Sequence, residues 1–247
     1  MSESPCKPEE LLISTFADLL DGVGHVAVGA LSPIPGCAAL LAREEARQKG
    51  GGDVQVSIIH GDANNPFTDG GRELFDCAGQ GRIGAFFLGG AEIDGEANIN
   101  LLGVGPYPDL NKRFPGSFGS AYVYFVIPKV ILFAPEHSKR VLVDRVEFIS
   151  APGGSPPEVH RPGGPKALVT GKCKMSFDAS AKRFTLVSTH PGISVEEVRD
   201  TTGFDFDVAD DVAVTPLPDK GRLALLRGVI GVQIAKTYPD FAARVFN

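Results

Sequence analysis

The 247-residue chain lacks an excess of positive charge and long apolar runs. It has 24 lysines and arginines against 30 aspartates and glutamates, a formal net charge of −6. Nucleic-acid binding would need a basic patch or stripe, so we expect no nucleic-acid partner. The longest apolar stretch, 122–133, is interrupted by Pro128 and Lys129, and it is shorter than the roughly 18 residues that span a bilayer. We therefore expect no membrane partner either.

Cysteine is also scarce. The four cysteines show no C-x-x-C spacing, which argues against a structural zinc site or a disulfide framework and fits a reducing compartment. The first residues lack the basic and apolar segments of a secretory signal. We expect a cytoplasmic protein without a bound metal. Cys37 lies near the expected start of a helix, and we interpret it as a small packing residue rather than an activated thiol.

Several familiar motifs are missing. Gly22-Val23-Gly24 precedes the first expected strand, and Gly103-Val104-Gly105 runs into a proline, so neither fits a dinucleotide-binding turn. No P-loop is present, and Gly116-Ser117-Phe118-Gly119 has the wrong spacing for a nucleophile elbow. The five histidines form no metal-binding pair. We interpret His137 as a solvated turn residue and His190 as a residue that fixes a turn.

The pattern that is present predicts an α/β protein. Strands are expected over 25–29, 54–59, 83–88, 122–127, 129–133, 141–149, 167–175 and 184–188. Helices are expected over 8–20, 38–49, 71–78, 194–199 and 223–232. Apolar strands that alternate with helices in the first half indicate a mainly parallel sheet covered on both faces. The second half is expected to be mixed or antiparallel, and 151–165 is interpreted as a long excursion from one domain.

Two glycine turns stand out between residues 85 and 121. An apolar run ends in Gly89-Gly90, and Gly116 and Gly119 follow about two dozen residues later. Glycine has no Cβ, so such turns let backbone N–H groups approach a polar ligand atom. An acyl or phosphate oxygen would suit these donors.

Polar residues follow two of the expected strands. His60 and Asp62 come after 54–59, and Glu92 and Asp94 come after 83–88. Open α/β sheets bind their ligands at the carboxyl ends of the strands, which makes these residues candidates for a site. Asp94 and Asn98 are also explained by side-chain hydrogen bonds that stabilise a turn.

Three segments in order resemble the β subunit of family I coenzyme A transferases, in particular of the glutaconate CoA-transferase type. Residues 85–94 with Asn98-Ile99-Asn100 resemble the GGAQID…GNxN block, and 113–121 resemble the GSGGA loop. Residues 190–198 with 202–206 resemble the PG…EEV…TGF signature. The resemblance implies a single three-layer α/β/α domain over 1–247 and a separate α subunit, in an assembly of two α and two β subunits. It also implies an acyl-CoA substrate that carries coenzyme A itself, with no tightly bound cofactor.

The chain departs from that family at the nucleophile. The family uses a glutamate at the end of an early strand to attack the thioester. Aligning the glycines puts Ile59 at this position, and a shift of one residue puts His60 there. Neither is a carboxylate, and Asp62 would need a rearranged loop. Glu92 stands where the family usually has glutamine, and Phe118 stands where its loop has glycine.

The resemblance and these departures together predict a hydrolase or decarboxylase of an oxo or dicarboxylic acyl-CoA. The candidate catalytic residues are His60, Glu92 and Asp62, and the candidate substrate-binding residues are Gly89, Gly90, Gly116, Phe118 and Gly119. Two alternatives stay open. One is a genuine CoA-transferase with a displaced carboxylate, Asp62 or Glu92. The other is a non-catalytic binding subunit whose partner carries the chemistry.

Overall fold

The computed structural model describes residues 6–61, 64–68 and 71–246. The chain divides into two compact units. The first takes its described residues from 1–77, 82–86 and 216–247, and the second consists of 78–81 and 87–215. The single domain over 1–247 that the resemblance implies stays a prediction.

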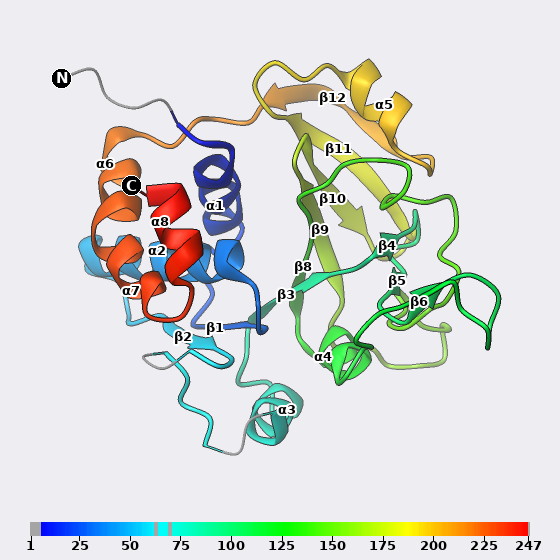
Figure 1. Ribbon diagram of the computed structural model, residues 1–247, viewed down its shortest axis with the longest axis horizontal. Helices are drawn as coiled ribbons and strands as arrows, with labels where there is room; N and C mark the ends of the chain where they lie inside the picture. Colours follow the sequence, from blue (N-terminus) through cyan, green and yellow to red (C-terminus); the bar gives the residue numbers. More distant parts are fainter. Residues whose placement is uncertain (1–5, 62–63, 69–70, 247) are drawn as a thin grey trace. The chain divides into compact units, whose positions relative to one another are not determined.

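The first unit contains a parallel arrangement of strands in the order β2, β1, β3. Its strands are β1 (His25–Val28), β2 (Gln55–Ile58) and the first residues of β3 (Ala85–Gly89). Its helical elements are α1 (Pro8–Asp18), α2 (Pro33–Gln48), most of α3 (Gly71–Gly79), α6 (Lys220–Leu225), the π-helical turn η1 (Leu226–Ile230), α7 (Gly231–Ala235) and α8 (Pro239–Phe246). The expected alternation of strand and helix is confirmed (Figure 1).

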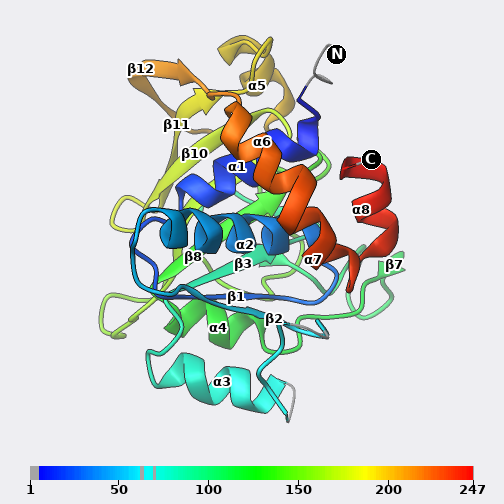
Figure 2. The ribbon, with the colours of Figure 1, turned by 90° about the vertical axis from the view of Figure 1, so that its left-hand side faces the viewer.

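Helix α2 is the central helix of this unit and contacts β1, β2, α1 and α7 (Figure 2). It begins at Pro33, five residues earlier than expected, because proline is well tolerated in the first turn, where its missing N–H is not needed. Gly36 lets α2 approach its neighbours closely. A Cβ at this position would lie 3.1 Å from Ile234 Cδ1 and 3.4 Å from Ile58 Cδ1.

The second unit contains a mixed sheet in the order β12, β11, β10, β9, β8 and the end of β3 (Figure 1). Its strands are β4 (Glu92–Ile93), β5 (Ile99–Asn100), β6 (Gly103–Val104), β7 (Lys112–Arg113), β8 (Lys129–Ala134), β9 (Pro165–Thr170), β10 (Cys173–Asp178), β11 (Arg183–Thr189) and β12 (Asp207–Val214). Its helices are α4 (Ser120–Val126) and α5 (Val195–Thr201). Strand β10 is antiparallel to both neighbours, whereas β8–β9 and β11–β12 are parallel. The expected mixed second half is confirmed.

The expected strand over 122–127 is wrong, because this segment is helix α4. Val123, Tyr124 and Ile127 are buried, whereas Tyr122 is 44% exposed. Burial at positions i, i+1 and i+4 is the helical period rather than the alternation of a strand. The aromatic and β-branched residues of the segment therefore pack in a helix despite their preference for strands.

Two other expected strands differ from the structure. Residues 141–149 form no strand, since only Leu142 makes an isolated bridge, to Ile93. The single strand expected over 167–175 is interrupted by a turn at Gly171-Lys172, which separates β9 from β10. Strand β12 was not expected from the sequence, because it is mostly exposed and lacks a continuous apolar run.

Candidate functional site

The turn after β2 carries His60, the first of the predicted catalytic residues. The Ile59 amide donates to the carbonyl of Val28 at 3.0 Å, and the Gly61 amide donates to that of Ile58 at 3.0 Å. His60 lies between them, exposed, with a φ of 64°. Its expected place directly after a strand is confirmed. Asp62 lies outside the described residues.

The second unit carries the first glycine turn, where β3 ends at Gly89. At Gly90 a Cβ would lie 2.5 Å from Ile99 Cγ2 and 2.8 Å from the carbonyl oxygen of Glu92, so only glycine fits. The next amide, of Ala91, donates to the carbonyl of Asn100 at 2.9 Å. Among the described residues the Gly90 amide has no acceptor. The turn therefore presents one free backbone donor, and its role in holding an acyl oxygen stays a prediction.

Glu92, the third predicted catalytic residue, is 7% exposed. Its Oε2 accepts hydrogen bonds from Asn100 Nδ2 at 2.8 Å and from the backbone N–H of Glu147 at 3.1 Å. The same Asn100 amide donates to the carbonyl of Gly103 at 2.7 Å. The carboxylate is thus held by fixed donors on two separate segments.

Asp94 and Asn98 stabilise the turn between β4 and β5. Asp94 Oδ1 accepts from the amides of Glu96 at 3.1 Å and Asn98 at 3.0 Å, and its Oδ2 accepts from Asn98 Nδ2 at 3.1 Å. Both side chains are buried. The turn-stabilising interpretation of this pair is confirmed.

The loop 114–119 is the second glycine turn and precedes α4. It begins where the Phe114 amide donates to Leu102 and ends where the Ser120 amide donates to Ser117. Between these points, Gly116 has a φ of 99° and Phe118 a φ of 42°. In the described part of the chain, the amides at positions 116, 117 and 119 have no acceptor. Successive free N–H groups in such turns form a concavity that binds anionic oxygens.

The interpretation of His137 as a solvated turn residue is wrong. It is not solvated but 7% exposed, with Nδ1 bonded to Thr170 Oγ1 at 2.7 Å and Nε2 to Thr202 Oγ1 at 3.0 Å. Burial, reinforced by the positive charge of Lys172, lowers its pKa to about 4. No local signal announces this site, because both threonines are distant in the sequence.

His190 begins a turn, since the Ile193 amide donates to its carbonyl at 3.0 Å, but its side chain bonds to residues outside that turn. Its Nε2 donates to the carbonyl of Thr170 at 2.9 Å, and its Nδ1 bonds to Thr215 Oγ1 at 3.1 Å. Burial lowers the pKa of this ring as well. Cys37 is fully buried in α2 and burial raises its thiol pKa, so its interpretation as a packing residue is also confirmed.

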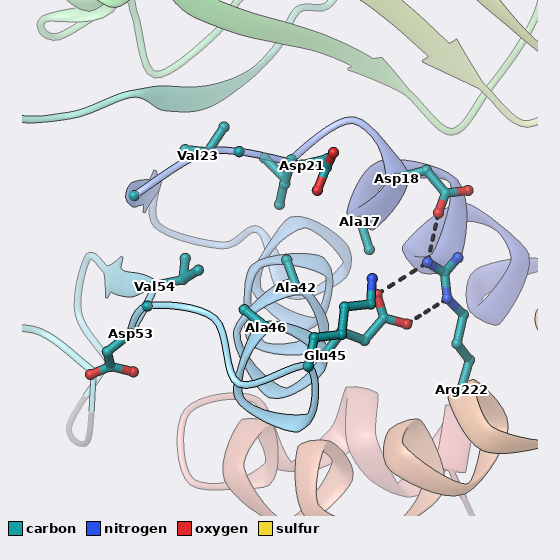
Figure 3. A pocket seen from close by; sticks show the side chains of 15 residues that line it. Ala17, Asp18, Asp21, Val23, Ala42, Glu45, Ala46, Asp53, Val54 and Arg222 are labelled. Carbon is teal, nitrogen blue, oxygen red and sulfur yellow. Dashed lines mark hydrogen bonds and ion pairs between the residues drawn. The ribbon is translucent and has the colours of Figure 1, made fainter.

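The first unit has a hollow of about 490 Å³ between the ends of α1 and α2 (Figure 3). Arg222 reaches into it and pairs with Asp18 at 2.7 Å and with Glu45 at 2.6 Å. A second hollow, of about 890 Å³, lies in the second unit and includes Asp94 and Arg145 in its lining. None of the described catalytic or substrate-binding candidates lines either hollow.

Metal clusters and membrane-spanning helices are both absent from the described residues. No three histidine, cysteine, aspartate or glutamate side chains in this part of the chain lie together as a metal site would require. None of the described helices has the length and apolar character needed to cross a bilayer.

Several curated proteins resemble the chain in sequence. A 3-oxoadipate CoA-transferase subunit from Pseudomonas knackmussii is 34% identical over 155 residues, 60% of this chain and 59% of that protein. A glutaconate CoA-transferase subunit from Acidaminococcus fermentans is 33% identical over 148 residues, 57% of this chain and 54% of that protein. The chain therefore spans little more than half the length of these two relatives. The IpdB subunit of a cholesterol ring-cleaving hydrolase from Rhodococcus jostii is 24% identical over 87% of this chain and 88% of that protein.

The fold also matches solved structures. The crystal structure of the decarboxylase AibA/AibB contains a chain that is 25% identical, with a TM-score of 0.76 over 98% of this chain and 99% of that chain. The model of one family, described as coenzyme A transferase, matches residues 26–201. That span is well over half of the sequence and includes both glycine turns, and it shows that the chain belongs to the coenzyme A transferase family.

Proposed function

We propose that this chain is the β-type subunit of an enzyme that cleaves a carbon–carbon bond in an acyl-CoA thioester, by hydrolysis or decarboxylation, and does not transfer coenzyme A. The substrate is the CoA ester of an oxo or dicarboxylic acid. The observation that carries the proposal is the set of free backbone donors in the two glycine turns, at Gly90 and in the loop 114–119.

Both reactions need the same electrostatic help. When the carbon–carbon bond breaks, its electron pair moves toward the thioester and leaves negative charge on the thioester oxygen. Backbone N–H groups that are already oriented stabilise such charge without reorganisation. The free amides of Gly90, Ser117 and Gly119 are suited to this role.

Neither reaction needs a nucleophilic carboxylate. CoA transfer proceeds through an acyl anhydride and a glutamyl thioester, so a carboxylate must attack the thioester carbonyl. The segment Ser57-Ile58-Ile59-His60-Gly61, at the end of β2, contains no carboxylate. Transfer by the family's route would therefore have no nucleophile at this position.

The cleaved intermediate must also recover a proton on carbon. His60, exposed after β2, is our first candidate for this step, because imidazole exchanges protons near neutral pH. Asp62 and Glu92 are the carboxylate candidates. Glu92 Oε2 already accepts two hydrogen bonds within the chain, so we rank this residue after His60.

The relatives support pairing with a second subunit. IpdB is named as a subunit of a ring-cleaving hydrolase, and AibA/AibB is a two-component decarboxylase. We propose that this chain likewise works with an α-type subunit, as two α and two β subunits, and that coenzyme A enters only as part of the substrate.

The test uses the chain co-expressed with the α-type subunit of the same organism. The complex is incubated with CoA esters of unsaturated dicarboxylic and of oxo acids, while release of CO₂ and of shortened acids is measured. In parallel, exchange of radiolabelled free acid into the CoA ester is followed. We expect carbon–carbon cleavage, with exchange of the free acid slower than cleavage by about 100-fold or more. An acid/base route without a nucleophilic carboxylate does not exchange the free acid into the CoA ester. Exchange as fast as cleavage would restore a transferase with a displaced carboxylate.

Three substitutions separate a catalytic subunit from a binding subunit. Loss of an acid/base group typically costs about 10²-fold or more in rate, so we expect this loss for at least one of His60→Ala, Asp62→Asn and Glu92→Gln. His160→Ala, in an exposed loop, is the matched control. Activity within threefold of wild type for all three variants would instead place the chemistry on the partner.

A further inference from the structure

Ser120 carries a buried hydroxyl that makes no hydrogen bond within the described part of the chain. The residue is 8% exposed, and its Oγ is closed off from solvent without a hydrogen-bond partner. Nearly all buried polar side-chain atoms in folded proteins have a partner, so an exception needs a physical reason. A buried hydroxyl without a bond lowers stability, because it has lost the hydrogen bonds that water gave it.

The other buried side-chain atom without a bond among the described residues differs in kind. It is Arg43 Nε, but Arg43 Nη1 donates to Asn64 Oδ1 at 3.1 Å and its Nη2 donates to Gln233 Oε1 at 2.6 Å. The guanidinium of Arg43 is therefore held through its two terminal nitrogens. Ser120 has no polar side-chain atom besides the hydroxyl that is left without a bond.

Capping of α4 does not account for this hydroxyl. A serine at the N-cap accepts from a backbone N–H two or three residues on, as Ser194 does from the Glu197 amide at 3.1 Å at the start of α5. Ser120 is already the first residue of α4, and the N-cap is Gly119. No bond from Ser120 Oγ to a nearby carbonyl takes the place of a cap.

The position of Ser120 in α4 directs its side chain toward the loop 114–119. Ser120, Val123 and Tyr124 lie on one face of the helix and are all buried. Side chains in a helix tilt toward its N-terminal end, and the residues before Ser120 are those of this loop. The amides at positions 116, 117 and 119 have no acceptor among the described residues. Free amides and an unbonded hydroxyl thus come together at one turn.

We propose that the Ser120 hydroxyl donates a hydrogen bond to the substrate oxygen that the free amides of this loop hold, which makes Ser120 a further substrate-binding residue. This inference rests on the proposed function, because it takes the ligand to be an acyl-CoA. The oxygen belongs to the thioester or to a free carboxylate of the acyl group, and both are acceptors. Serine changes rotamer by rotation about one bond, and no hydrogen bond of the ligand-free chain opposes that rotation. The stability lost by leaving the hydroxyl unbonded is then recovered when the substrate binds.

The test compares Ser120→Ala with wild type in the complex with the α-type subunit. The substitution breaks no hydrogen bond of the ligand-free chain and removes a buried polar atom, so the melting temperature should stay equal or rise. Dissociation constants are measured for glutaryl-CoA and for valeryl-CoA, whose acyl group has the same number of carbons but no free carboxylate. We expect Ser120→Ala to weaken the binding of glutaryl-CoA by about fivefold or more, because the ligand loses one hydrogen bond.

The two esters together identify which oxygen is bound. If Ser120→Ala weakens both esters equally, the hydroxyl binds the thioester oxygen that both carry. If only glutaryl-CoA is weakened, the hydroxyl binds the free carboxylate. Both results support the inference.

Ser120→Cys separates hydrogen bonding from packing, because a thiol fills the space of the hydroxyl but is a weak donor. We expect its dissociation constants to match those of Ser120→Ala. Affinity equal to that of wild type would show that the volume of the side chain matters rather than its hydrogen bond, and the inference would be overturned.

Ser194→Ala is the matched control, since it removes a serine hydroxyl that is bonded at the start of α5. Its melting temperature should fall while both dissociation constants stay unchanged, which is the opposite of the result expected for Ser120→Ala. Unchanged binding of both esters by Ser120→Ala overturns the inference while the proposed function stands. A lower melting temperature together with weaker binding assigns Ser120 a structural role, and the inference also fails. If the wild-type complex binds neither ester, the proposed function itself fails.

Discussion

Asn100 donates its side-chain amide to the carboxylate of Glu92 at 2.8 Å, directly across the β4–β5 hairpin. Asn98 makes the same type of bond to Asp94 at 3.1 Å. Between these two pairs Ile93 lies opposite Ile99, and both isoleucines are fully buried. The alternating residues of the two strands therefore separate into polar pairs and an apolar pair, as side chains in strands do.

The Glu92–Asn100 pair predicts how two substitutions differ in stability. Glu92→Ala leaves the Asn100 amide and the Glu147 N–H without this acceptor, and we expect a loss of about 1–3 kcal/mol in the free energy of unfolding. Glu92→Gln keeps one acceptor oxygen and the family's usual side chain, so its loss should be smaller. Urea unfolding measures both, with exposed Glu96→Ala as the control. Equal losses for Ala and Gln would contradict this account.

The sequence predicted the parts of the site that depend on local pattern. Gly89-Gly90 and His60 lie at strand ends, as expected, because apolar runs that stop at glycine or polar residues mark those ends. The helix at 120–126 was missed because its aromatic and β-branched residues favour strands locally, whereas tertiary packing of Val123 and Tyr124 selects the helix.

Gly90 and Gly116 require glycine for different physical reasons, which predicts a different loss of stability for alanine at each position. Gly90→Ala would bring a Cβ within 2.5 Å of Ile99 Cγ2 and 2.8 Å of a carbonyl, so neighbouring atoms must move. Gly116→Ala meets no atom within 4 Å and carries only the strain of its φ of 99°. We expect about 1–2 kcal/mol for Gly116→Ala and a larger loss for Gly90→Ala. Thermal unfolding of both variants checks the order, and a reversed order would refute the packing argument.

Glu10 and Arg227 form an ion pair that joins α1 to η1, with the carboxylate buried and the guanidinium partly exposed. Nε contacts Oε1 at 2.7 Å and Nη2 contacts Oε2 at 2.9 Å, while Glu10 is fully buried. Removing one partner of such a pair leaves an uncompensated buried charge. We therefore expect Arg227→Met to cost about 3–5 kcal/mol in the free energy of unfolding.

The control for this prediction is an exposed ion pair of the second unit. Arg183 and Asp207 lie 2.8 Å apart with side chains 41% and 59% exposed. Exposed pairs contribute less than about 1 kcal/mol, so Asp207→Ala should change stability little. Chemical denaturation measures the free energy of unfolding of Arg227→Met and Asp207→Ala. Similar losses for the two variants would show that the burial of Glu10 does not determine how much stability is lost.

Contacts between distant segments explain what the sequence did not reveal. His137 lies in a charged, turn-like stretch, and its buried environment comes from Thr170 and Thr202, which no local pattern connects to it. The exposed edge strand β12 gave no apolar signal. The free amides of the loop 114–119 were expected only as a general property of glycine-rich turns. The positive φ of Phe118 could not be expected, because bulky residues rarely adopt it.

The buried His137 ring predicts that acid destabilises the fold. Burial favours the neutral ring, in which Nε2 donates to Thr202 Oγ1, because that hydroxyl already donates to the carbonyl of Val198. Its pKa is about 4 in the folded chain against 6.5 for an ordinary histidine, chiefly through burial. Between these values the unfolded chain binds a proton that the folded chain does not. Stability therefore falls as the pH drops from about 6.5 toward 4, by up to about 3 kcal/mol for this residue.

Urea unfolding at pH 7.5, 6 and 5 measures this loss. His137→Asn removes the titrating ring, so the variant should be less stable at pH 7.5 but lose less stability on acidification. Lys172 and Glu197, which act on the ring with opposite signs and pair with each other at 2.8 Å, stay in place in this variant. His60→Asn changes an exposed histidine outside this network and should keep the wild-type slope. A His137→Asn slope equal to that of wild type would show that the acid sensitivity arises elsewhere, with His190 the next ring to substitute because burial lowers its pKa in the same direction.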